Sequence, residues 1–189
     1  MKKLFNFIGL AMIIFISGCA GSSNYMAPAT PISGPEQDKA VVYFMRPSGM
    51  GFAINFQIWD RDQFIGLSQA KSYFAYQCDP GKHLFIGIAE NKRGVLAELE
   101  AGKSYYMITQ VRMGGWRARL AMIPVTRDSK FWDQVETYKS KLKFIQAKPE
   151  MIAQWNTTKK AKIQEIINIL ENTEKGKKYV LPLTAQDGR

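Results

Sequence analysis

Histidine and cysteine, the side chains that most often ligate transition metals or serve as nucleophile and base, are scarce in this chain of 189 residues. It holds one histidine, His83, and two cysteines, Cys19 and Cys78. A single histidine excludes a histidine-rich metal site, and a Ser-His-Asp or Cys-His arrangement would have to use this residue beside a turn. We therefore predict a structural role for His83, no metal or other cofactor, and no disulfide framework.

Other chemical signatures are also missing. Gly114-Gly115 lacks the lysine and helix that follow a phosphate-binding glycine loop. Asp60 and Asp62 lack the glycine and later glutamate of a calcium loop, so a polar hairpin turn is favoured. Glu98 and Glu100 share one face of a strand beside a turn, which is typical of a solvated edge rather than a hydrolytic cleft. We predict no catalytic residue, although a hydrolase with an unrecognised site stays open as an alternative.

The N-terminus carries an apolar run from Leu4 to Ile16 behind two lysines, followed by Ser17-Gly18-Cys19. The run is about half to two thirds of the roughly 20 residues that span a bilayer, which argues against an uncleaved anchor helix. The stretch Phe15–Cys19 resembles the lipobox of bacterial prolipoproteins, with Ile16 where that family most often has leucine. The resemblance implies cleavage after Gly18, diacylglycerol on the Cys19 thiol and acylation of the new N-terminus.

Without residues 1–18, the chain has 171 residues with 24 lysines and arginines against 16 acidic residues, a net charge near +8. A basic protein of the envelope meets anionic phospholipid and lipopolysaccharide head groups first, so no nucleic-acid partner is predicted. With Cys19 acylated, Cys78 has no intramolecular partner. Its alternation with Phe74 and Tyr76 predicts a buried, inert side chain.

Residues 19–38 are rich in Gly, Ser, Ala and Pro, and Pro28, Pro31 and Pro35 block a regular ladder, which predicts a flexible tether. Position 20, directly after Cys19, is alanine. An aspartate there would resemble the inner-membrane retention signal of enterobacterial lipoproteins, so its absence leads us to expect the lipid-anchored protein in the outer membrane, facing the periplasm. We predict four segments: a signal peptide (1–18), the tether (19–38), a β-sandwich domain (39–125) and a helical C-terminal extension that packs on it (126–189).

The segment 39–125 reads as a series of strands separated by turn signals every eight to twelve residues. Ala53–Trp59, for example, places Ile54, Phe56 and Ile58 on one face and Asn55, Gln57 and Trp59 on the other, as a sheet with one wetted side requires. We predict an antiparallel sandwich or barrel with no parallel crossover. The expected strands are 40–45, 53–59, 64–67, 72–78, 83–89, 95–99, 104–112 and 116–125.

Four motifs in this segment carry a family resemblance: Val41–Pro47, Ile65-Gly66, Pro80–His83 and Leu99–Tyr106. Together they resemble an uncharacterised family of bacterial lipoproteins over about Lys39–Val125. The resemblance implies a Greek-key, prealbumin-like (carboxypeptidase-regulatory-like) β-sandwich of about seven to eight strands. It supplies no site residues, because the motifs are strand and turn chemistry.

After Pro124 the apolar period becomes helical. A first helix is predicted from the stripe Phe131, Val135, Tyr138, Leu142 and Ile145. A second begins at Pro149 and ends by Gly176, with its apolar face formed by Ile152, Trp155, Ile163, Ile166, Ile167 and Leu170. The short connection 146–148 predicts an antiparallel helical hairpin, and 179–183 predicts an extended run.

Two surface features are candidates for binding. The basic cluster Lys139, Lys141, Lys143, Lys159, Lys160 and Lys162 offers an anionic contact, with a solvated helix face as the alternative. Aromatic residues offer a glycan groove, with core packing favoured for each of Tyr105, Tyr106, Trp116, Trp132 and Trp155.

The leading functional hypothesis is a non-enzymatic envelope lipoprotein that binds or scaffolds protein partners. The alternative is a module for peptidoglycan or lipopolysaccharide. The expected partners are the membrane, through lipidated Cys19, and an envelope protein or an anionic glycan or lipid head group.

Overall fold

The computed structural model describes residues 24–113 and 118–189. The predictions for the signal peptide, for Cys19 and for Gly114, Gly115 and Trp116 lie outside the described residues. Within them, no helix has the length and apolar character needed to cross a membrane.

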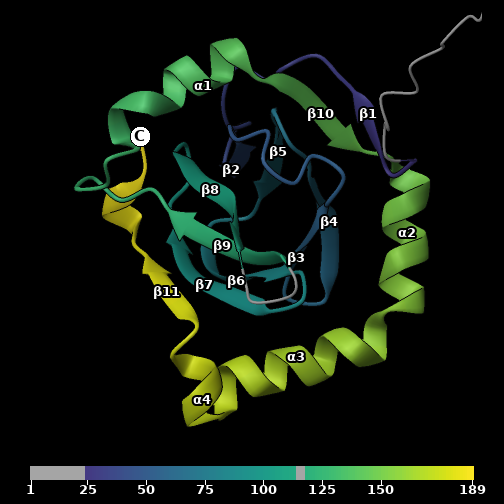
Figure 1. Cartoon of the computed structure of the whole chain (residues 1–189). Helices are drawn as coiled ribbons and strands as arrows, with labels where there is room; N and C mark the ends of the chain where they lie inside the picture. The colour runs from purple at the N-terminus through teal and green to yellow at the C-terminus, as the bar shows by residue number, and fades with distance from the viewer. Residues whose placement is uncertain (1–23, 114–117) are drawn as a thin grey trace, which may run out of the picture.

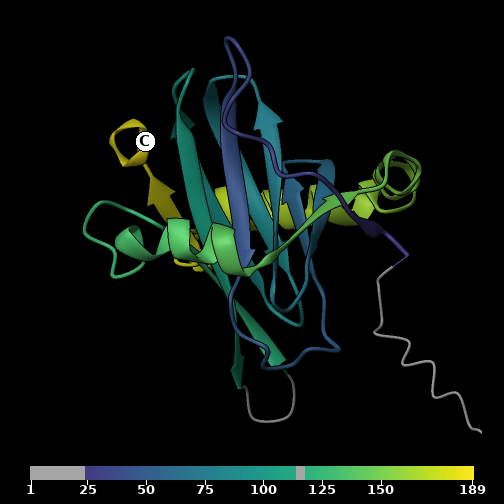
Figure 2. The ribbon, with the colours of Figure 1, turned by 90° about the horizontal axis from the view of Figure 1, so that it is seen from above.

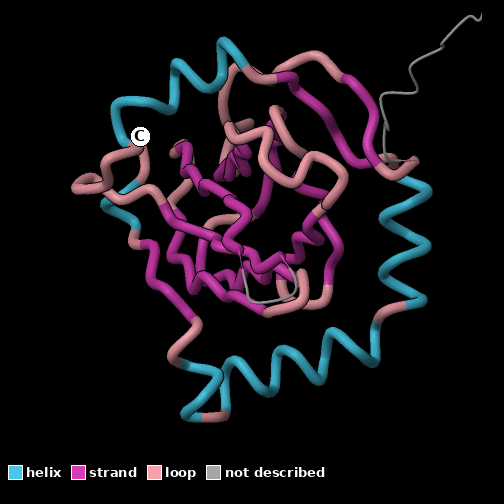
Figure 3. The backbone as a smooth tube through the Cα atoms, in the orientation of Figure 1, coloured by secondary structure: helices cyan, strands magenta, loops and turns pink. Residues whose placement is uncertain are grey.

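The described chain is mainly β and forms a sandwich of two sheets, with helices around its perimeter (Figures 1 and 3). The six-stranded sheet has the order β1 (Met26–Pro28), β10 (Lys143–Ala147), β5 (Ser72–Cys78), β2 (Ala40–Arg46), β8 (Ser104–Met113) and β9 (Ala118–Pro124). The five-stranded sheet has the order β11 (Val180–Leu183), β7 (Lys92–Leu99), β6 (Gly81–Ile88), β3 (Phe56–Asp60) and β4 (Gln63–Ser68).

Both sheets are mixed, so the prediction of an entirely antiparallel sandwich is wrong. β2 pairs with β8, β10 with β5, and β11 with β7 in parallel. A parallel neighbour needs a long connection, and here the chain crosses to the other sheet or passes through helices before it returns. The strand number also exceeds the seven to eight expected, because β1, β10 and β11 come from outside residues 39–125.

The main core lies between the sheets. Phe44 of β2 stacks on Phe74 of β5 with ring centroids 5.0 Å apart, and it meets Phe85 of β6 edge-on at 5.5 Å. A second core lies on the outer face of the six-stranded sheet, where Tyr43 and Val135 are buried. Strand β2 is therefore buried on both faces, which explains its unbroken apolar sequence.

The helix predicted over 131–145 is wrong in its second half. A 3₁₀ turn, η1 (Trp132–Gln134), leads into α1 (Val135–Lys141), and Leu142 is already extended. Phe144 and Ile145 belong to β10 and are buried. The edge of β5 offers backbone hydrogen bonds to this segment, and tertiary pairing outweighs a helical pattern of only about four turns.

The C-terminal segment forms a belt around the sandwich, not a helical hairpin. We call residues 131–183 the C-terminal belt: η1, α1, β10, α2 (Pro149–Thr158), α3 (Lys160–Asn172), α4 (Glu174–Lys177) and β11 follow the perimeter in that order (Figure 1). Lys159 separates α2 from α3 where one helix was predicted. Ile163, Ile166 and Leu170 of α3 are buried in the main core, so this helix packs on the sandwich.

Two further segments differ from their predicted limits. Met26, inside the range predicted as tether, is 3% exposed, and β1 pairs with β10. Strand β3 begins only at Phe56, and residues 47–55 form a loop that includes Ile54. Trp59 is buried rather than wetted, because Phe64 and Trp155 pack against it.

Candidate functional site

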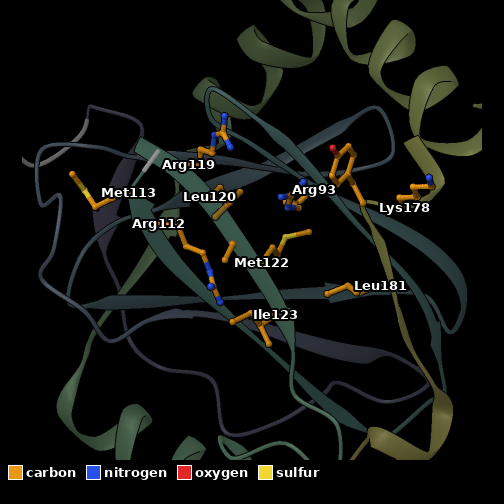
Figure 4. A pocket seen from close by; sticks show the side chains of 11 residues that line it. Arg93, Arg112, Met113, Arg119, Leu120, Met122, Ile123, Lys178 and Leu181 are labelled. Atoms are coloured by element: carbon orange, nitrogen blue, oxygen red, sulfur yellow. The ribbon is translucent and has the colours of Figure 1, made fainter. Parts of the chain in front are cut away.

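A groove of about 540 Å³ opens at the side of the sandwich, between the edge strand β9 of one sheet and the edge strand β11 of the other (Figure 4). Leu120, Met122, Ile123 and Leu181 supply its apolar lining. The two edge strands belong to different sheets, and in the described part of the chain no strand pairs across the gap. The topology therefore builds an open, elongated surface.

The cationic side chains of Arg93, Arg112, Arg119 and Lys178 line the same space, which we call the basic groove (Figure 4). Over residues 24–113 and 118–189, no carboxylate lines the basic groove and none of these four side chains forms an ion pair. Like charges gathered in a concave surface focus the electrostatic potential. The basic groove is thus suited to an anionic ligand.

Arg112 and Arg119 are directly opposite each other in the β8·β9 pair. Like charges in such cross-strand positions are destabilising, by roughly 0.2–1 kcal/mol relative to neutral pairs. Both residues are exposed, so water reduces the repulsion without removing it. The pair does not add to stability, and its two guanidinium groups present adjacent positive charge at one place on the surface.

Arg93 is held in place by Tyr179. Its guanidinium carbon lies 4.4 Å from the centre of the Tyr179 ring. The parallel pairing of β11 with β7 brings the two residues together, and Gly94 N donates to Tyr179 O at 2.9 Å. Arg93 Nη1 donates to Lys92 O at 3.3 Å, and the remaining N–H groups of the guanidinium can donate to a carboxylate or phosphate.

Asn91 connects the two sheets at one end of the basic groove. Its side-chain amide donates to Leu120 O at 2.9 Å and accepts from Leu120 N at 2.7 Å. One position on the free edge of β9 is therefore already occupied, which fixes the spacing between β9 and the β6–β7 turn.

The groove continues toward α3 and α4 in a second hollow of about 690 Å³, which shares Arg93, Arg119 and Tyr179. Ile169 and Lys175 extend the apolar and basic character there, while Glu90 adds one carboxylate. The polar side chains of the basic groove itself are arginine, lysine and tyrosine, which can contact an anion through charge and N–H or O–H donors.

His83, the one residue that a triad would need, has both ring nitrogens engaged. Nδ1 lies 2.7 Å from Asp60 Oδ2, and Nε2 lies 2.9 Å from the carbonyl oxygen of Asp79. Two acceptors require two N–H donors, so the imidazolium is the form that fits. The Asp60 hydrogen bond raises the pKa of His83 above its ordinary value, against the opposing effect of burial. The ring also stacks on Phe85, as a structural side chain would.

Two neighbours of His83, Tyr76 and Cys78, are held in their neutral forms. Burial, together with Asp60, raises the pKa of Tyr76, and the same causes raise the pKa of the Cys78 thiol to about 12. Cys78 is 6% exposed, so its prediction as a buried side chain is confirmed.

The carboxylates considered from the sequence lie apart. Asp60 pairs with His83, and Asp62 accepts from Gln164 Nε2 at 3.2 Å. Glu98 and Glu100 are exposed, and Glu100 forms an ion pair with Lys103. No group of three or more His, Cys, Asp or Glu side chains that could hold a metal ion occurs in the described ranges.

The predicted basic cluster is not brought together. Lys139 and Lys141 lie on α1 and Lys143 on β10, whereas Lys159, Lys160 and Lys162 lie at the α2–α3 junction (Figure 1). The aromatic candidates among the described residues do not form a groove either. Tyr105 and Tyr106 are buried, Trp155 packs on Phe64 at 4.6 Å, and Trp132 lies under the Arg189 guanidinium at 4.0 Å.

The basic groove was not predicted, although part of its signal was present. The hairpin expected around Met113-Gly114-Gly115 places Arg112 and Arg119 near each other. Arg93 and Lys178 join them only through the β7·β11 pairing, which no local pattern encodes.

A comparison of the chain with protein-family models, with curated proteins and with solved structures finds no match.

Proposed function

We propose that this protein is a membrane-anchored envelope lipoprotein and a non-enzymatic binding module, with the basic groove as its contact surface for an acidic partner. The observation that carries the proposal is the gathering of four cations without a carboxylate between two open strand edges. An extended protein segment can add to such an edge while its acidic side chains meet the arginines. A protein partner with an acidic, extended stretch is the occupant that this geometry fits best.

Charge reversal in the groove tests the proposal. Arg112→Glu with Arg119→Glu exchanges one exposed like-charge pair for another of opposite sign, so it should leave the fold intact and abolish in-cell crosslinks to the partner. Lys160→Glu with Lys162→Glu, on the outside of α3, is the matched control and should preserve the crosslinks. If the crosslinks survive in the groove variant and are lost in the control, the binding surface lies on α3 and not in the basic groove.

A phosphorylated glycolipid is the second candidate ligand, and the apolar lining favours it. Met122, Ile123 and Leu181 lie beside the cations, so the groove presents phosphate-binding and acyl-binding surfaces together. If lipopolysaccharide is the ligand, the purified protein should shift it in a binding assay, and the Arg112→Glu, Arg119→Glu variant should not.

We further propose that Cys19 is the lipid attachment site and that the domain belongs to the prealbumin-like lipoprotein family that its motifs resemble. The apolar run that ends at Ser17-Gly18-Cys19 supports the anchor, and the two-sheet sandwich is compatible with the family. Cys19→Ser should block processing and leave a larger precursor on a denaturing gel. A product of wild-type size would contradict the lipobox interpretation.

A further inference from the structure

The loop between β2 and β3 displays three large apolar side chains to solvent. Phe52 is 81% exposed, Met50 56% and Ile54 37%. Met113, at the end of β8, is 82% exposed. Figure 2 shows that the loop and the end of the β8–β9 hairpin project from the same, lower end of the sandwich. We call Met50, Phe52, Ile54 and Met113 the apolar tip.

The loop is held rigidly by a buried cation. Arg46 is 0% exposed, and its guanidinium donates to Ile54 O at 2.5 Å, to Met50 O at 2.8 Å and to Gly51 O at 2.8 Å. It also lies over the Phe56 ring at 4.6 Å. Burying a guanidinium without a carboxylate costs free energy, so the hydrogen bonds that satisfy it fix the conformation of the loop. Its apolar side chains are displayed on a preorganised support.

The backbone of the loop fits closely against β8. Gly51 has φ of 61°, and a Cβ there would lie 3.1 Å from Val111 Cγ2. A side chain at this position would therefore be strained and crowded. The loop therefore packs closely on β8, the strand that ends in Met113.

The sandwich is charged asymmetrically from end to end. Strands β2, β4, β6 and β8 run toward the tip and β3, β5 and β7 run away from it. In the described tip loops and strand ends, Glu90 is the single carboxylate, beside the cations Lys71, Arg112 and Arg119. The opposite end carries the carboxylates Asp60, Asp62, Asp79, Glu98 and Glu100 together with the cations Lys39, Arg61, Lys82 and Lys103. Its charges therefore largely balance, whereas those of the tip are mainly positive.

Apolar side chains and cations at the same end of the sandwich match one environment in particular: the interface of a bilayer that contains anionic phospholipid, where the cations meet phosphates and the apolar groups enter the acyl region. We propose that the apolar tip inserts into such a bilayer and fixes the orientation of the domain, as a contact additional to the lipid on Cys19.

The proposed insertion depends on the proposed lipid anchor, which holds the domain at the membrane. Seven residue steps separate Cys19 from Met26, the first residue of β1. Even a fully extended backbone spans them in about 25 Å. The ten residues of β8 are longer than that, at about 33 Å. The anchor thus keeps the domain within its own height of the bilayer.

Environment-sensitive labels at the two ends of the sandwich test the insertion. Ala53, beside Phe52, and Ala101, at the opposite end, are both exposed alanines. Each is replaced by cysteine in the full chain, labelled with a fluorophore and reconstituted into phosphatidylcholine vesicles with phosphatidylglycerol. The buried Cys78 stays unlabelled, as the parent chain verifies. The Ala53→Cys label should report an apolar environment and be quenched by spin-labelled lipid, whereas the Ala101→Cys label should stay in water.

Adding Phe52→Glu to the Ala53→Cys chain should reduce the inserted fraction by about tenfold or more, since burial of one phenyl ring shifts an equilibrium by at least that factor. Vesicles of phosphatidylcholine alone should also weaken insertion. If the protein stays on the vesicles but the Ala53→Cys label remains in water, the insertion is overturned and the anchor stands. Insertion that Phe52→Glu leaves unchanged would overturn the proposed role of the apolar tip in the same way. Loss of the protein from the vesicles would overturn the anchor and the insertion together.

Discussion

His83 gives the protein a titration that can be followed at a single residue, because it is the only histidine. Its side chain is 14% exposed and that of Asp60 is 10% exposed, so the pair is shielded from water. The cluster joins the end of β3 to the β5–β6 turn and closes the sandwich at the end away from the apolar tip.

The pH dependence of unfolding follows from this pair. The folded pKa of His83 is raised above the ordinary value of 6.5, so the stability contributed by the protonated ring is fully present below pH 6.5. That contribution is lost as the pH rises through the folded pKa. We expect His83→Gln to cost about 1.5–3 kcal/mol at low pH and progressively less above it, as measured by urea unfolding.

Asp60→Asn is the companion variant, because it keeps the shape of the side chain and removes the charge that favours the imidazolium. It should flatten the same part of the pH profile. If the difference in the free energy of unfolding between wild type and His83→Gln grows with rising pH, the charged His83–Asp60 pair is contradicted.

At the scale of elements, α3 is divided between core and surface. Ile163 is 1% exposed and packs in the main core, whereas Ile169 on the same helix is 42% exposed. Ile163→Asp should therefore unfold the domain, with a loss of several kcal/mol from a buried unpaired charge, and Ile169→Asp should change stability by less than about 1 kcal/mol. Circular dichroism and thermal melts of the two variants measure the difference. A folded, cooperative Ile163→Asp protein would show that α3 is not part of the core.

The strands with local signals were the predictable elements. Ser72–Cys78 has the limits that its sequence predicts, and Ala40–Arg46 extends the expected strand by one residue. The C-terminal belt was harder to predict. Leu142 and Ile145 continue a helical spacing, whereas Phe144 and Ile145 also suit a buried strand. The open edge of β5 decides between them, and that edge is known only once the sheet is formed.

The candidate site shows the same division. Arg112 and Arg119 follow from one hairpin, but Arg93 and Lys178 are 85 residues apart in the sequence. Register in a parallel pair such as β7·β11 depends on the intervening 80 residues, so local reasoning had no means of placing Lys178 beside Arg93. The buried role of Arg46 was equally hidden, because its partners are backbone carbonyls that carry no residue-type signal.

For the whole molecule, the C-terminal belt makes unfolding a single event. β11 completes one sheet, β10 extends the other, and Ser104 and Arg189 exchange two backbone hydrogen bonds of 2.8 and 3.0 Å. Leu183→Ala, at a position 1% exposed, should cost about 2–5 kcal/mol, whereas Leu181→Ala, at a position 42% exposed, should cost less than about 1 kcal/mol. Calorimetry should show one transition in each variant. A separate low-temperature transition in Leu183→Ala would mean that the belt melts independently.

The late position of β10 and β11 in the chain governs the order of assembly. A ribosome delivers the strands of both sheets first, and the partners for β5 and β7 emerge only after residues 143 and 180. Until then both strand edges stay unpaired and can associate with other chains. The β2·β8 pairing likewise joins residues more than sixty positions apart, and such distant pairings slow folding. We therefore expect the nascent chain to need a holding chaperone through most of its synthesis and to aggregate when translation stops before the belt is complete.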